Sequence, residues 1–145
     1  MTTTLRTRAD PATEAWKALL KFLATERPPR FAAVAQEFDL SMQQLKLLHA
    51  LAPGVELPMS ALAEELHCDA SNVTGIVDRL QERGLIERRP DPTDRRVRRL
   101  ALTGGGERMR AEVLDRLHEP PAQMSRLSLS EQRALRDLLE KALSE

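Results

Sequence analysis

Cysteine and aromatic residues are scarce in this sequence. Its 145 residues include one cysteine, no tyrosine, one tryptophan and three phenylalanines. A single cysteine excludes an intrachain disulfide and fits a reducing compartment. No apolar run is long enough to cross a bilayer and no signal-peptide pattern is present, so the sequence predicts a cytoplasmic location and no membrane partner.

Catalytic motifs are also missing. The sequence has no P-loop, G-x-S-x-G, H-E-x-x-H or C-x-x-C pattern. Its three histidines are scattered, and the adjacent His67 and Cys68 on a turn do not make a full metal site. We therefore predict no enzyme, no cofactor and no metal. Two alternatives stay open, namely metal sensing by residues that a dimer brings together and redox sensing by Cys68.

Residues 60–103 organise the rest of the chain. Apolar spacing predicts a short helix, a polar turn at residues 67–69 and a second helix with one buried stripe: Val73, Ile76, Val77 and Leu80. Gly84 stands where that helix should end in a left-handed conformation. Residues 86–89 and 98–102 predict two strands joined by a turn, and residues 55–57 a minor third strand. This order predicts a winged helix-turn-helix, which lays its second helix in the DNA major groove.

The outward face of the second helix carries the candidate base contacts. Small hydrogen-bonding side chains suit base edges, and arginine suits phosphates. Gly75 is unexpected, because a glycine in mid-helix costs about 1 kcal/mol relative to alanine. Two explanations stay open for it, a close approach to DNA and a tolerated surface glycine. The residues of this helix that we assign to DNA are Ser71, Asn72, Thr74, Gly75 and Arg79.

The hairpin concentrates positive charge in a chain whose formal net charge is zero. Residues 87–99 hold six arginines against three acidic residues, which gives +3. A solvated face is the alternative, but beside a helix-turn-helix such a run favours phosphate or minor-groove contacts. The wing residues that we assign to DNA are Arg88, Arg89, Asp94, Arg95, Arg96 and Arg98.

Short segments along this region form a set of motifs. They are Val77-Asp78-Arg79-Leu80, Glu82-Arg83-Gly84-Leu85-Ile86, Arg88-Arg89-Pro90-Asp91-Pro92, Asp94-Arg95-Arg96 and Leu102-Thr103-x-x-Gly106. Together they resemble the MarR family of bacterial transcription regulators, and a D-x-R wing followed by L-T-x-x-G is the most specific part of that resemblance. The similarity is dense from about Leu40 to Gly106.

The resemblance implies a mostly helical homodimer that represses or activates transcription, binds pseudo-palindromic double-stranded DNA and is often released by a small ligand. It also implies that Arg96 enters the minor groove, with its guanidinium held by a salt bridge to Asp94. Effectors of the family bind in a largely apolar crevice between the dimerisation helices and the winged domain. The candidates here for a small aromatic effector are Trp16, Leu19, Phe31 and Phe38, although aromatic residues at helical spacing are more often plain core.

Amphipathic helices flank the winged region on both sides. Asp10-Pro11 predicts a capped helix start, and three consecutive glycines after Thr103 predict a weak start for a helix over residues 104–117. We expect residues 1–145 to form a single chain of the resembling family. The winged helix-turn-helix occupies residues 40–103, and residues 10–39 and 104–145 form a helical dimerisation region. A monomer with a helical cap is the alternative.

The fold class predicted from the sequence is mostly α with a small β-hairpin wing, a winged helix-turn-helix plus N- and C-terminal dimerisation helices. The predicted function is a DNA-binding transcription regulator, a repressor that binds its operator as a homodimer. A winged-helix module for protein–protein contacts, without sequence-specific DNA binding, is the alternative. Such a module would not need an arginine-rich wing.

Overall fold

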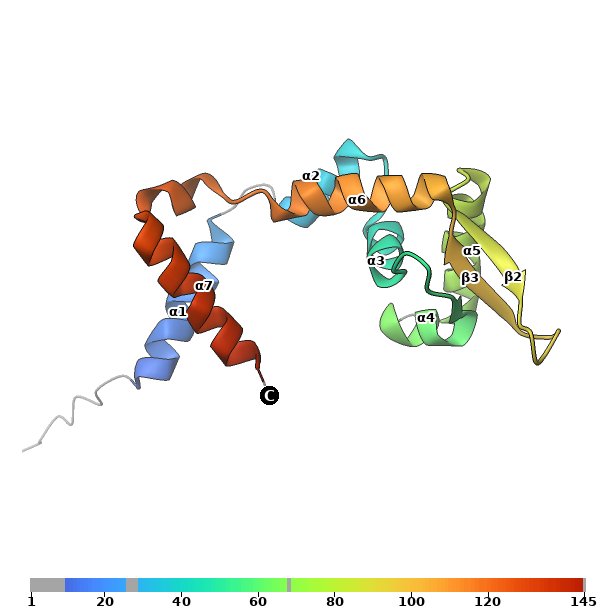
Figure 1. Cartoon of the computed structure of the whole chain (residues 1–145), viewed down its shortest axis with the longest axis horizontal. Helices are drawn as coiled ribbons and strands as arrows, with labels where there is room; N and C mark the ends of the chain where they lie inside the picture. Colours follow the sequence, from blue (N-terminus) through green and yellow to red (C-terminus); the bar gives the residue numbers. More distant parts are fainter. Residues whose placement is uncertain (1–9, 26–28, 68, 145) are drawn as a thin grey trace, which may run out of the picture.

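The computed structural model describes residues 10–25, 29–67 and 69–144 of the chain. These residues are mostly helical, with one small antiparallel sheet, which confirms the predicted fold class. Figure 1 shows a winged part built around the sheet and, beyond a connecting segment, an arm that contains α1 and α7. The elements are α1 (Pro11–Ala24), α2 (Arg30–Glu37), α3 (Met42–Ala50), β1 (Leu57–Pro58), α4 (Met59–Glu65), α5 (Ala70–Glu82), β2 (Ile86–Pro90), β3 (Arg98–Leu102), α6 (Gly104–His118), the 3-10 helix η1 (Ala122–Arg126) and α7 (Leu129–Leu143).

The winged part has one hydrophobic core. The sheet order is β1-β3-β2, with Leu57 opposite Leu100 and Ile86 opposite Leu102. The predicted third strand therefore exists, although it begins at Leu57 rather than at residue 55. Apolar side chains of α3, α4 and α5 close over the sheet, and α6 adds Val113. The fully buried members are Leu45, Leu47, Leu48, Leu51, Leu62, Val73, Val77, Leu80, Ile86, Leu100 and Val113.

Most of the predicted helix boundaries have a local physical cause. Ser41 and Ser128 each form a capping box, in which the serine side chain and the residue three positions later satisfy each other's backbone N–H. Gly84 has φ = 70°, the left-handed conformation expected where α5 ends. The expectation for Asp10 was wrong in one respect, because its side chain makes no capping hydrogen bond to α1.

Among the three glycines after Thr103, Gly106 is explained by a packing contact that the sequence did not indicate. Thr103 caps α6 by accepting a hydrogen bond from the backbone N–H of Gly106 at 3.0 Å. Gly106 is buried against the start of the wing, where an added Cβ would lie 2.9 Å from the carbonyl carbon of Leu85 and closer still to its oxygen. Only glycine allows the first turn of α6 to approach Leu85 in this way.

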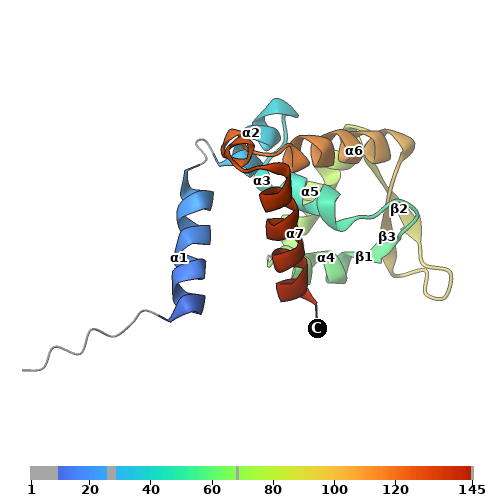
Figure 2. The same ribbon diagram turned by 60° about the vertical axis from the view of Figure 1, so that its left-hand side comes forward.

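The arm differs from the winged part because its apolar side chains are not covered. Neither α1 nor α7 has a buried residue, and Trp16 and Leu138 are 58% and 66% exposed. In Figure 2, α1 and α7 stand apart from each other, so they do not cover each other's stripes within one chain. Among the helices of the described residues, none combines the length and apolarity that a membrane span requires.

Candidate nucleic-acid interface

Helix α5 presents the face that the sequence predicted. Its stripe of Val73, Ile76, Val77 and Leu80 is buried in the core, and that fixes the rotation of the helix. The opposite side chains are all exposed: Ser71, Asn72, Thr74, Asp78 and Arg79, together with Gly75. The helix therefore offers hydroxyl, amide and guanidinium groups from one surface, the chemistry that reads base edges and phosphates.

A groove separates this surface from the beginning of α3. It has a volume of about 260 Å³, and one wall is formed by α5 and the other by residues at the N-terminus of α3. Gly75 lies on this groove, and a Cβ there would meet nothing within 4 Å. Packing inside the chain therefore does not require a glycine at this position. The residues that line the groove are Ser41, Gln43, Gln44, Ser71, Asn72, Gly75, Ile76 and Arg79.

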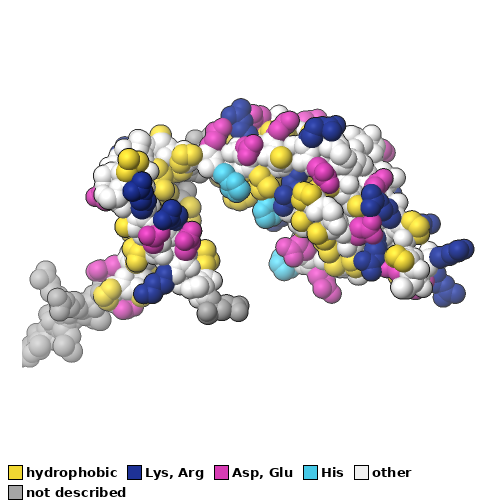
Figure 3. Space-filling model, viewed as in Figure 1, with side chains coloured by type: hydrophobic (Ala, Val, Ile, Leu, Met, Phe, Trp, Pro, Cys, Tyr) yellow, Lys and Arg dark blue, Asp and Glu magenta, His cyan; other side chains and the backbone are white. Residues whose placement is uncertain are grey.

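The arginines of the wing fall into two groups. Three of them form ion pairs within the chain. Arg88 pairs with Asp78, Arg89 with Glu56 and Glu87, and Arg99 with Asp91. The hydrogen bonds that Arg89 donates to Glu56 and Glu87 raise the pKa of Arg89. The guanidinium groups of Arg95, Arg96 and Arg98 make no hydrogen bond or ion pair with any residue that the structure describes. Figure 3 shows dark blue basic side chains gathered at the far end of the hairpin.

The turn at the wing tip is shaped by Asp91, a residue that the sequence reasoning did not select. Its Oδ1 accepts hydrogen bonds from the backbone N–H and the hydroxyl of Thr93, at 2.8 and 2.6 Å, and from the N–H of Asp94 at 3.1 Å. Its Oδ2 accepts from Nε of Arg99 at 2.5 Å. These bonds, those of Thr93 and Arg99 above all, hold the pKa of the Asp91 carboxyl far below its usual range. The Asp-x-Thr spacing, typical of a side-chain-closed turn, was the signal for this role.

The expected salt bridge between Asp94 and Arg96 is not formed. Oδ1 of Asp94 instead accepts a hydrogen bond from the backbone N–H of Arg96 at 2.9 Å. A carboxylate two residues before an N–H closes a local turn more readily than it reaches a long, solvated side chain. Asp94 thus fixes the backbone that carries Arg96 and leaves the guanidinium exposed.

Residues 40–97, which include α5 and most of the wing, match the model of the MarR family. The winged part of this chain is therefore similar to the MarR family. Among its relatives is the transcriptional repressor MprA of Escherichia coli (strain K12), 40% identical over 86 residues that make up 59% of this chain and 49% of MprA. The crystal structure of the YusO protein from Bacillus subtilis matches with a TM-score of 0.70 and 28% identity over 92% of this chain and 96% of that one.

The match over residues 40–97 confirms the resemblance predicted from the sequence motifs. A cysteine-to-serine mutant of MarR from E. coli, solved in complex with operator DNA, shares the fold with a TM-score of 0.60 and 24% identity over 94% of this chain and all of that one. The chain spans about half the length of the curated relatives it matches. The likeness therefore applies most closely to the winged part.

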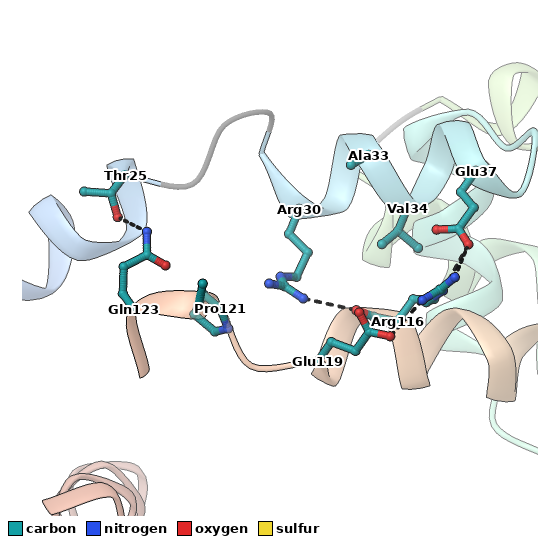
Figure 4. A pocket seen from close by; sticks show the side chains of 10 residues that line it. Thr25, Arg30, Ala33, Val34, Glu37, Arg116, Glu119, Pro121 and Gln123 are labelled. Atoms are coloured by element: carbon teal, nitrogen blue, oxygen red, sulfur yellow. Dashed lines mark hydrogen bonds and ion pairs between the residues drawn. The ribbon is translucent and has the colours of Figure 1, made fainter. Parts of the chain in front are cut away.

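The effector candidates chosen from the family pattern do not gather in one pocket. Trp16 and Phe31 are more than half exposed, and Phe38 packs against the hydrophobic core. A pocket with a volume of about 390 Å³ lies where α2, α6 and η1 meet, and none of the four candidates lines it (Figure 4). Its lining residues are Thr25, Arg30, Ala33, Val34, Glu37, Arg116, Glu119, Pro121, Ala122 and Gln123.

This pocket is polar, whereas the family resemblance implies a largely apolar crevice. Nε of Arg116 donates to Glu37 at 3.0 Å and Nη1 to Glu119 at 2.8 Å, and the side chain of Arg30 donates to the carbonyl of Arg116 at 3.3 Å (Figure 4). The hydrogen bonds to Glu119 and Glu37 raise the pKa of Arg116. The assignment of Trp16, Leu19, Phe31 and Phe38 to an effector stays a prediction. Cys68, the candidate redox residue, lies outside the described residues.

Proposed function

We propose that the chain is a DNA-binding transcription regulator, a repressor that binds pseudo-palindromic operator DNA as a homodimer. The observation that carries this proposal is the set of guanidinium groups of Arg95, Arg96 and Arg98, which have no partner among the described residues, beside an outward face of α5 rich in hydrogen-bonding side chains. Exposed arginines without acidic partners keep their full charge for phosphates or for a narrow minor groove.

The helix and the wing have different tasks in this proposal. Asn72 and Thr74 read base edges in the major groove, because amide and hydroxyl groups donate and accept hydrogen bonds there. Arg96 binds the backbone or the minor groove, which show little sequence beyond A·T against G·C. Ser71, Gly75 and Arg79 line the groove beside α3, where a phosphate strand of the duplex is expected to pass.

Selection of duplexes from random-sequence DNA, followed by salt titrations, tests this division. Asn72→Ala should relax the preference at particular base pairs, at a cost of about 1–3 kcal/mol of discrimination, and leave the salt dependence unchanged. Arg96→Ala should weaken binding to most sequences and lower the slope of log K against log salt by about 1. If no duplex is enriched and none is bound, the alternative of a protein–protein interaction module is favoured.

The homodimer is supported by the apolar stripes of the arm. Both α1 and α7 expose large apolar side chains, and they do not cover each other within the chain. Large exposed apolar patches mark interaction sites, and a two-fold dimer places two recognition helices on two half-sites. Light scattering at micromolar concentration should therefore give twice the chain mass of 16.3 kDa. A monomer mass would contradict both the dimer and the pseudo-palindromic operator.

Release by a small ligand completes the proposal. The pocket between α2, α6 and η1 is one place for such a ligand, and its two arginines stand beside two glutamates, so the lining carries no net charge. Calorimetric titration with an aromatic acid such as salicylate and with an uncharged aromatic alcohol tests for binding of either kind. Heat from one of them would support release by a small ligand, and silence from both would leave the regulator without this step.

A further inference from the structure

Arg88 reaches from the wing to the recognition helix. Its Nη2 lies 2.5 Å from Oδ1 of Asp78, and its Nη1 donates to Oε1 of Gln81 at 2.6 Å. Asp78 and Gln81 are three residues apart and so share one side of α5. Both terminal nitrogens of the Arg88 guanidinium therefore hydrogen-bond to side chains of α5.

The sheet register directs this side chain toward the core side of the wing. Arg88 on β2 stands opposite Leu100 on β3, and Leu100 is fully buried. Residues directly opposite each other in an antiparallel pair extend from the same face of the sheet. Arg88 consequently extends from the face that packs on the helices, and its side chain is only 28% exposed. Arg95 and Arg96, by contrast, lie in the exposed turn beyond the paired strands.

Asp78 places a negative charge on the face of α5 that is proposed to approach DNA. It is the acidic residue on the outward face of α5 between Thr74 and Arg79, and its side chain is 50% exposed. A bare carboxylate on a face that approaches phosphates repels them, since like charges at close range oppose association. Arg88 neutralises this charge and, through Gln81, joins strand to helix.

We propose that Arg88 is a positioning residue, which neutralises Asp78 and holds the wing against the recognition helix instead of contacting a phosphate. The inference rests on the proposed function, because it assigns a role within DNA binding. It divides the wing arginines into those that build the interface and those that contact DNA.

Four full-length variants test it: Arg88→Ala, Asp78→Asn, the double variant, and Arg95→Ala as a matched control on the same hairpin. Their affinity is measured by fluorescence anisotropy on a labelled duplex recovered by selection, across a range of salt. Arg88→Ala should weaken binding about ten-fold with an unchanged salt slope, whereas Arg95→Ala should lower the slope by about 1. Adding Asp78→Asn to Arg88→Ala should recover most of the lost affinity, because the pair is then neutral as in the wild type.

A second readout uses the protein without DNA. Amide hydrogen exchange across β2 and β3 should speed up in Arg88→Ala and remain unchanged in Arg95→Ala, since Arg88, unlike Arg95, hydrogen-bonds to side chains of α5. If the double variant binds as weakly as Arg88→Ala with a lowered salt slope, Arg88 is a phosphate ligand and the inference is wrong. If the wild type binds no duplex, the proposed function fails. If amide hydrogen exchange in Arg88→Ala is the same as in the wild type, the positioning role is wrong, whatever the outcome of the DNA titrations.

Discussion

Gly75 offers a test in which stability and DNA binding should move in opposite directions. The glycine lies in the middle of α5, is exposed, and has no neighbour within 4 Å of the place that a Cβ would take. Within the free protein, Gly75→Ala therefore adds a methyl group to open space and creates no clash. Its effect on folding reduces to the backbone preference of the helix.

The two magnitudes can be estimated separately. Replacing glycine by alanine in an exposed helix interior stabilises the fold by about 1 kcal/mol, which raises the melting temperature of a chain of this size by roughly 2–4 °C. If the groove beside Gly75 receives DNA, the same methyl group holds the helix away from the duplex. Loss of contacts worth about 1–3 kcal/mol corresponds to a Kd about 5- to 150-fold weaker.

Thermal melting and anisotropy titration on one selected duplex measure both effects. Gly104→Ala is the matched control, because Gly104 is also exposed in a helix and a Cβ there would meet only the side chain of Arg108, at 3.6 Å. It should leave DNA affinity unchanged. If Gly75→Ala melts higher and binds as tightly as the wild type, then Gly75 is a tolerated surface glycine and DNA does not approach it closely.

Three further changes have expected outcomes. Gly106→Ala should lower the free energy of unfolding by about 2–4 kcal/mol in urea titrations, because its methyl group would overlap the carbonyl of Leu85 and the backbone must move. Leu138→Glu should convert the dimer to monomer in light scattering, since it places a charge on the exposed stripe of α7. Asp91→Asn should destabilise the fold near pH 7 in urea titrations, and its difference from the wild type should shrink as pH falls below about 4.

The direction of the pH effect predicted for Asp91→Asn follows from the lowered pKa of the Asp91 carboxyl. The folded carboxyl has a pKa far below the unfolded value of about 3.9, so the unfolded state takes up the proton first as the solution is acidified. The stabilisation from the carboxylate is thus complete above the unfolded pKa and disappears as pH falls toward the folded one. An unchanged difference between variant and wild type at pH 7 and pH 3 would contradict the role given to this charge.

The helices and the wing could be predicted because their signals are local. The spacing of Val73, Ile76, Val77 and Leu80 fixes which face of α5 is buried, and Gly84 marks where the helix ends. Such features require no knowledge of the neighbouring elements, and the structure confirms them.

The parts that the sequence could not predict depend on residues far apart along the chain. Arg88 and Arg96 look alike in a basic run, yet the former meets Asp78 ten residues earlier and the latter meets no acidic partner in the described part of the chain. In the sequence, Gly106 is one of three glycines that predict a weak helix start. Only its contact with Leu85, 21 residues earlier along the chain, explains why a glycine is required there. The exposed stripes of α1 and α7 are visible as patterns in the sequence, but the sequence does not say what covers them, and the proposed homodimer is our account of it.

The ion pairs of the wing also determine how the protein should find DNA. The chain has a formal net charge of zero, and three of the six hairpin arginines are neutralised by acidic partners. At physiological salt, charges are screened beyond about 8 Å, so the wing tips attract DNA only at short range. Because long-range steering is weak, the association rate should change little with salt concentration. The tip arginines displace counterions from DNA when they bind, so the dissociation rate should rise as the salt concentration rises. The salt dependence of the affinity should therefore reside mainly in dissociation, in contrast to a uniformly basic DNA-binding protein.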